Sequence, residues 1–131
     1  MRERYLLVPK SRQLTITWLF CGLYLWEALI FPSRRTFIQN KKEADSENNI
    51  KRALTIHERL PGWMREWQPC KYTYCHLDFP RSRSEIRGVP AGAHHVRGFT
   101  ASGVFVDEAA FVDDMDQTLA AIRPALGKIG K

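Results

Sequence analysis

The stretch GVFVDEAAF at residues 103–111 decides the fold, because an apolar strand there ends in two adjacent carboxylates, Asp107 and Glu108. Nucleotide sites of parallel sheets lie at the carboxyl ends of the strands. In ATPases the first carboxylate of such a pair holds Mg²⁺, and the second orients and deprotonates the attacking water. The alternative interpretation is that the pair simply begins a solvated loop.

The start of the chain predicts a second part of the same site. RYLLVP at residues 4–9 is typical of a short strand, and a polar loop and an apolar helix follow it. Amides at a helix N-terminus favour phosphate, although the usual phosphate loop reads G-x-x-x-x-G-K-[ST]. Residues 9–17, PKSRQLTIT, lack both glycines and the usual lysine. A polar turn before a core helix is the alternative interpretation.

The remaining pattern predicts an α/β domain with a mainly parallel sheet flanked by helices. Further strands are expected at residues 35–39, 71–77, around Ile86 and at 104–106, and helices at residues 50–60 and 113–126. If the opening strand and the late strand lie in one sheet, the polar loop and the Asp-Glu pair face each other across a nucleotide.

An almost continuously apolar segment, residues 14–31, has two interpretations. Its length is close to that of a membrane span, and basic residues flank both ends. Glu27, Thr15, Thr17 and Gly22 weaken that interpretation and favour a helix buried in the domain. The alternative of a single-pass membrane-anchored small protein therefore stays open on these residues alone.

Composition limits the class of protein. A chain of 131 residues is sufficient for one domain, and a formal charge of +6 favours an anionic partner such as nucleic acid or an acidic membrane surface. Residues 101–122 carry five acids and no base, which suggests a cation site. Three cysteines provide no even disulfide framework, so a reduced, cytoplasmic setting is expected.

Three strings together resemble the large subunit of phage terminases, the ATP-driven motors that package viral DNA. They are SEIRGVPAGA at residues 84–93, RGFTASG at 97–103 and VFVDEAAF at 104–111. The loop KSRQ at residues 10–13, followed by TWL at 17–19, resembles the deviant phosphate loop of the same family. The resemblance extends from Tyr5 to about Leu126.

The resemblance implies a role for each site residue. It implies a phosphate-wrapping loop formed by Lys10, Ser11, Arg12 and Gln13. Arg12 would also act in catalysis on the γ-phosphate, Thr17 and Asp107 would hold Mg²⁺, and Glu108 would be the catalytic base. Thr15 and Ile16 stand where the family has a Gly-Lys pair, so Lys10 or Arg12 would have to neutralise the phosphate charge.

The resemblance also implies a P-loop NTPase-like fold, incomplete at its C-terminus, with residues 1–131 forming a partial ATPase domain without the nuclease domain. The implied cofactors are ATP and Mg²⁺. The implied partners are double-stranded DNA, the small terminase subunit and the portal protein, in the host cytoplasm and with no membrane. A helicase or another DNA-dependent P-loop ATPase is the alternative within the same class, and activity of the fragment is not implied.

Three other groups of residues have a weaker functional interpretation. The residues that could suggest a zinc site are Cys70, Cys75, His76, His94 and His95. The spacing of the two cysteines disfavours zinc binding. Trp63 and Trp67 are expected to pack in a core rather than to stack on bases. A solvated loop is expected for the basic run of Arg81, Arg83 and Arg87.

Overall fold

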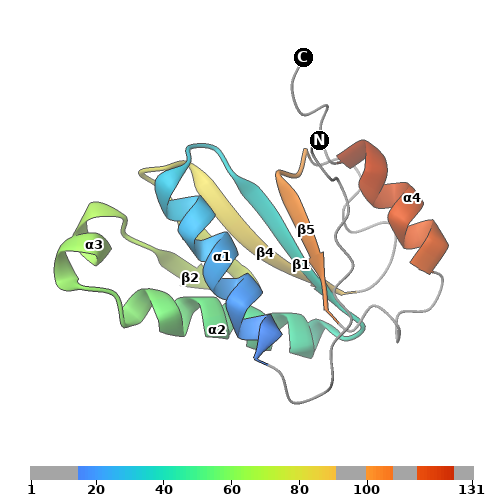
Figure 1. The fold of residues 1–131 in the computed structure, drawn as a ribbon, viewed down its shortest axis with the longest axis horizontal. Coiled ribbons are helices and arrows are strands. Elements are labelled where there is room, and N and C mark those ends of the chain that lie inside the picture. Colours follow the sequence, from blue (N-terminus) through green and yellow to red (C-terminus); the bar gives the residue numbers. More distant parts are fainter. Residues whose placement is uncertain (1–14, 91–99, 108–114, 126–131) are drawn as a thin grey trace.

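A computed structural model of the chain describes residues 15–90, 100–107 and 115–125 (Figure 1). The predicted opening strand, residues 4–9, lies outside these ranges. The elements in chain order are α1 (Ile16–Ile30), β1 (Arg35–Asn40), α2 (Glu43–Glu58), α3 (Gly62–Trp67), β2 (Lys71–Thr73), β3 (His76–Phe79), β4 (Ser84–Pro90), β5 (Gly103–Val106) and α4 (Met115–Ala125). The expected α/β class is confirmed.

The sheet has five strands in the order β2-β3-β4-β1-β5. Strand β1 pairs in parallel with β4 and with β5, whereas β2–β3 and β3–β4 are antiparallel. The prediction of a mainly parallel sheet is therefore wrong for the described residues, which form a mixed sheet. The cause is a hairpin, because β2 and β3 are too closely spaced in the chain for the crossover that a parallel pair requires.

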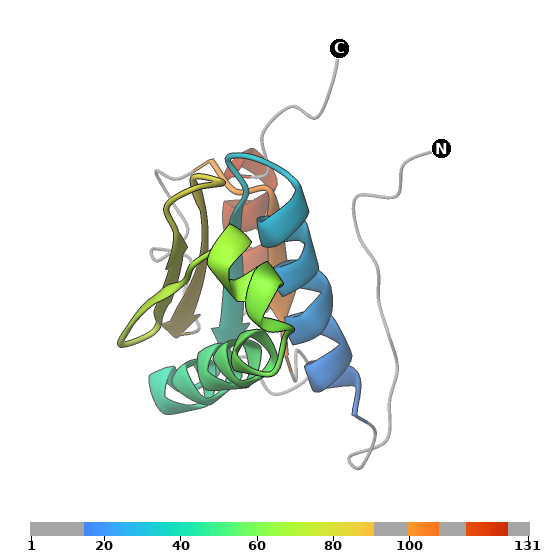
Figure 2. The same cartoon turned by 90° about the vertical axis from the view of Figure 1, so that its left-hand side faces the viewer.

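Helices α1 and α2 pack on one face of this sheet and form the main core with it (Figure 2). The strands contribute alternate residues to that face, as the two-residue period of a pleated strand requires. The core combines Cys21, Leu25, Ala28 and Leu29 of α1, Ile50 and Ala53 of α2, and Ile38, Leu77, Phe79 and Ile86 of the strands.

Helix α2 approaches β4 closely at Gly88. A Cβ atom at that position would lie 3.0 Å from the carbonyl oxygen of Ser46 and 3.1 Å from Cγ1 of Ile50. Ser46 also donates a hydrogen bond of 2.7 Å from its hydroxyl to the carbonyl oxygen of Val89. The glycine thus permits the close packing that joins the start of α2 to the end of β4.

The opposite face of the sheet is divided into two halves. Phe37 and Ala101 are buried there with Val89 and Val104 packed against them, near β1 and β5. Towards β3 and β4 the same face carries charged side chains, centred on Glu85. In Figure 1 helix α4 lies on the β5 side of the molecule.

Two local predictions are corrected by the structure. The expected strand at residues 71–77 is two strands, β2 and β3, separated by a turn in which Cys75 has a φ of 54°. Trp63 and Trp67 do not pack in the core: both are exposed on the short helix α3, Trp63 by 68%. Apolar spacing identified the helix but not its degree of burial.

The apolar segment at residues 14–31 forms α1, whose 15 residues span about 22 Å against the roughly 30 Å of a bilayer core. Among the helices that the structure describes, none has both the length and the apolar character needed to cross a membrane. Helix α2 begins at Glu43, seven residues before the predicted helix. Its buried face includes two polar residues near the start, Ser46 and Asn49, which the spacing of apolar residues could not reveal.

Candidate nucleotide site

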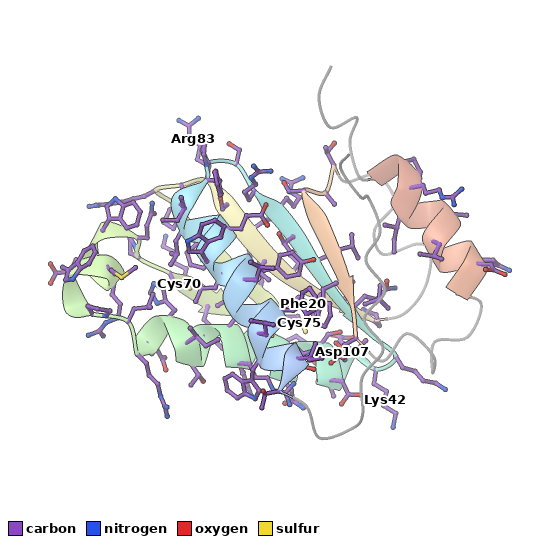
Figure 3. All side chains as sticks on the ribbon, viewed as in Figure 1. Phe20, Lys42, Cys70, Cys75, Arg83 and Asp107 are labelled. Carbon is purple, nitrogen blue, oxygen red and sulfur yellow. The ribbon has the colours of Figure 1, made fainter. Side chains whose placement is uncertain are left out.

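Two of the predicted site residues, Thr17 and Asp107, lie in the described part of the chain and are in contact. The Thr17 hydroxyl donates a hydrogen bond of 3.1 Å to Oδ2 of Asp107, across 90 residues of sequence. Both side chains are buried. Figure 3 shows Asp107 at the end of β5, beside the first turn of α1. The structure therefore brings together the two residues to which the sequence assigned Mg²⁺.

Local structure explains why these two residues meet. Asp107 directly follows β5, and its backbone N–H donates to the carbonyl oxygen of Gln39 at 3.0 Å, which extends the β1–β5 pairing by one residue. Helix α1 is joined to β5 by Phe20, which stacks on Phe105 with ring centroids 4.6 Å apart. This stacking places Thr17, one turn before Cys21, at the carboxyl end of the strand.

The N-terminus of α1 has the electrostatic character of an anion site. Its first turn contains no acidic residue, and the cap residue Thr15 makes no side-chain hydrogen bond to the helix amides. By contrast, the first turn of α2 carries Glu43 and Asp45. Acids at a helix N-terminus compensate the helix dipole, so α1 keeps a partial positive charge for an anionic ligand.

A buried network of neutral polar groups holds Asp107 from the other side. The Asn49 amide donates to Oδ1 of Asn40 at 2.9 Å and lies 3.5 Å from Oδ2 of Asp107. The backbone N–H of Asn40 in turn donates to the Ser46 hydroxyl at 3.2 Å. Three elements, β1, α2 and β5, thus converge on one carboxylate.

None of the polar residues in this network, Asn40, Ser46 and Asn49, was predicted as a site residue from the sequence. A signal was available, because Ser46 and Asn49 fall on the same helical stripe as Ile50, Ala53 and His57. Polar residues at core positions of a helix require hydrogen-bond partners. If the helical spacing is continued towards the start of α2, Ser46 and Asn49 fall on the buried face, which indicates a structural or functional role for both.

Cys21 and Arg52 border the site. Burial raises the pKa of the Cys21 thiol to about 12, and the Asp107 charge raises it further against the opposing effect of Arg52. The thiol therefore stays protonated at neutral pH and packs as part of the buried core. The Arg52 guanidinium donates to Oδ1 of Asn49 and lies 5.8 Å from the centre of the Trp18 ring.

The other predicted site residues, Lys10, Ser11, Arg12, Gln13 and Glu108, lie outside the described residues. A hydroxyl and a carboxylate are oxygen ligands of the type that Mg²⁺ prefers. Among residues 15–90, 100–107 and 115–125, no three side chains of His, Cys, Asp or Glu gather as a metal cluster. Thr17 and Asp107 fit the protein part of a Mg²⁺ site in which water and phosphate provide the other ligands.

A hollow of about 610 Å³ lies at the opposite ends of the parallel strands. It is lined by Ser33, Arg35, Asp78, Pro80, Arg83, Ser84, Glu85, Thr100 and Ser102. This hollow contains none of the predicted site residues. Its acids and arginines are partly paired, since Glu85 contacts Arg35 at 2.7 Å and Arg87 at 3.3 Å.

Comparison with known proteins does not assign the chain to a family. No protein-family model matches it, and no curated protein sequence matches it at a significant level. Functional inference for this protein therefore depends on the Thr17–Asp107 contact and its surroundings.

Proposed function

We propose that this chain is the nucleotide-binding part of an ATPase that acts on DNA, with Thr17 and Asp107 at its magnesium site. The hydrogen bond of 3.1 Å between these residues carries the proposal, because it joins the hydroxyl and the carboxylate to which the terminase resemblance assigns Mg²⁺. A threonine in the first turn of a helix, next to a carboxylate that ends a parallel strand, is the arrangement that P-loop ATPases use to hold Mg²⁺.

Each group of the proposed site has an expected role in ATP hydrolysis. Mg²⁺, when bound with ATP, would neutralise charge on the β- and γ-phosphates. Thr17 would direct its hydroxyl oxygen to the ion, and Asp107 would hold the ion directly or through water. The N-terminal amides of α1 would face the phosphates. Glu108 would act as the base on the attacking water, and Lys10, Ser11, Arg12 and Gln13 would surround the phosphates, with Arg12 on the γ-phosphate.

The more specific part of the proposal is a viral DNA-packaging motor. It rests on the resemblance of residues 84–93 and 97–111 to terminase large subunits, together with the basic charge of +6. Its partners would be duplex DNA, the small terminase subunit and the portal protein, in the host cytoplasm. The alternative, a helicase or another DNA-dependent P-loop ATPase, would use the same site and act on DNA without packaging it.

Titration of the purified chain with a fluorescent ATP analogue and Mg²⁺ tests the proposal. We expect saturable binding that requires Mg²⁺. Asp107→Asn should weaken it at least about ten-fold, because a neutral amide holds Mg²⁺ poorly. Any ATP turnover should be lost in Glu108→Gln while binding is retained.

Asp78→Asn provides a matched control, since Asp78 lies in β3 and lines the hollow at the opposite end of the sheet. Its affinity for Mg²⁺-ATP should equal that of the wild type. Binding that is absent in the wild type, or equally strong in Asp107→Asn, would reject the proposed site.

A further inference from the structure

The outer face of α1 is an apolar stripe formed by Leu19, Leu23, Trp26 and Ile30. These side chains are between 46% and 68% exposed, while Cys21, Leu25 and Ala28 are buried on the opposite side of the same helix. Glu27 is the only charged residue of α1. A helix that is apolar on all sides is normally covered on all sides, so the stripe requires an occupant.

The spacing of the stripe is that of a helix-pairing seam. Its members follow one another at intervals of four, three and four residues. That alternation keeps apolar side chains on one line along a helix and lets them pack into the spaces of a second helix. The occupant that this geometry fits best is another helix with the same pattern.

The exposed area is sufficient for a second copy of the chain. Phe31, which follows the C-terminal end of the stripe, is also 38% exposed, and its ring meets the Trp26 ring edge to face with centroids 5.5 Å apart. Together the five side chains expose on the order of 500 Å² per copy, so two copies would bury about 1,000 Å², the lower bound for a specific interface.

The chemistry of the stripe disfavours other occupants. A helix that lies on an anionic membrane surface carries Lys and Arg on its polar side, whereas α1 contains neither. Nucleic acid would require basic residues on the stripe. Self-association satisfies an entirely apolar surface without any charged partner.

We propose that two copies of this chain associate through antiparallel packing of their α1 helices along the Leu19, Leu23, Trp26 and Ile30 stripe. A two-fold axis at the middle of the stripe places Leu23 of each copy against Trp26 of the second copy, and Leu19 against Ile30 of the second copy. This inference is independent of nucleotide binding, because the stripe faces away from the core that α1 shares with β5.

Sedimentation analysis of the full chain between about 1 and about 100 µM tests the proposal. We expect a dimer, and we expect Leu23→Glu to raise the dissociation constant at least ten-fold. Trp63→Glu is the control, since Trp63 is 68% exposed but lies on α3, and this variant should remain dimeric. Circular dichroism reports whether each variant is folded, and Leu19→Gln replaces Leu23→Glu if the latter does not fold.

A mixing experiment tests the antiparallel register. Leu23→Glu and Trp26→Lys should each be monomeric alone, and their mixture should form a heterodimer, because the introduced charges face each other across the two-fold axis. A wild-type chain that remains monomeric at about 100 µM would overturn the proposal. So would a Leu23→Glu variant that dimerises like the wild type, or a monomeric wild type that binds phosphatidylcholine vesicles.

Discussion

Each end of the parallel strands carries a carboxylate, and the side chains that contact the two carboxylates differ. At the carboxyl ends, the hydroxyl of Thr17 and the amide of Asn49 approach Asp107. At the amino ends, Glu85 lies 2.7 Å from Arg35 and 3.3 Å from Arg87, and its Oε2 is 3.0 Å from Nε2 of the His76 ring. The two acids thus lie at opposite ends of one sheet, and arginines contact Glu85 while a hydroxyl and an amide donate to Asp107.

The partners of Glu85 include two arginines, which use its charge within the fold, whereas the hydroxyl and amide beside Asp107 orient that carboxylate by hydrogen bonds. A hollow of about 610 Å³ lies at the Glu85 end, whereas the proposed magnesium site lies at the opposite end, beside Asp107.

The largest expected loss of stability comes from a substitution that forces α2 away from the sheet near the end that carries Asp107. Gly88→Val places a branched side chain against the Ser46 carbonyl and Ile50, at about 3 Å. We expect a loss of about 3 kcal/mol in the free energy of unfolding, measured by urea titration. Gly62→Ala is the control, because the nearest atom to its new Cβ is 3.9 Å away. Equal stability of Gly88→Val and wild type would contradict the close packing described for α2 and β4.

A smaller loss is expected when the neutral network is broken. Asn49→Leu removes the donor that links Asn40 to Asp107 and leaves their buried oxygens with one partner fewer. We expect a loss of about 2 kcal/mol in urea unfolding. Asn48→Leu offers a matched control on the exposed side of α2. If both variants lose the same stability, the network does not stabilise this end of the sheet.

The Glu85 end should show a pH dependence. Burial raises the pKa of Glu85, but the hydrogen bond from His76 and the charges of Arg87 and Arg35 outweigh it and hold this pKa below its ordinary value of 4.5. The unfolded chain therefore takes up the proton first as pH falls. The stability from Glu85 is complete above pH 4.5 and is lost as pH falls through the lower folded value.

Glu85→Gln should therefore lower stability by at most about 1 kcal/mol at neutral pH, because the surrounding ion pairs are partly exposed. The difference from wild type should shrink at about pH 3, in parallel urea titrations. Glu66→Gln on the exposed side of α3 serves as the control. A difference that is constant over this pH range would show that Glu85 acts through its shape rather than its charge.

The smallest effect is expected at Arg83, in the turn between β3 and β4. Its φ of 58° is in the left-handed region, which favours glycine. Arg83→Gly should raise stability by about 0.5 kcal/mol, because it removes backbone strain at some cost in chain entropy. Arg83→Ala keeps the strain and should not be stabilised. A thermal melt that ranks Ala above Gly would contradict this explanation.

The sequence predicted elements best where a strong pattern was continuous. The apolar run of α1, the strand β1 and the strand that ends at Asp107 were each identified within a few residues. The hairpin of β2 and β3 was missed because its turn, which includes Cys75, contains neither glycine nor proline. The pairing direction of these strands depends on that turn, so the prediction of a mainly parallel sheet was wrong as well.

The site was predictable only in part, for a physical reason. Asp107 belongs to a local pattern, the end of an apolar strand, that is visible in a short window, whereas the role of Thr17 was implied by the resemblance of residues 10–19 to a terminase phosphate loop. Asn40, Ser46 and Asn49 acquire their role from the packing of α2 against β1 and β4. Such a role depends on tertiary contacts, which a helical or strand period does not specify.

The affinity for Mg²⁺-ATP of two substitutions at one position tests the central claim most directly. Thr17→Ser keeps the hydroxyl that reaches Asp107, and Thr17→Val keeps the shape but removes that hydroxyl. The account predicts that Thr17→Ser binds within about three-fold of wild type and that Thr17→Val binds at least about ten-fold more weakly. Equal affinity of the serine and valine variants would contradict a magnesium site built on Thr17 and Asp107.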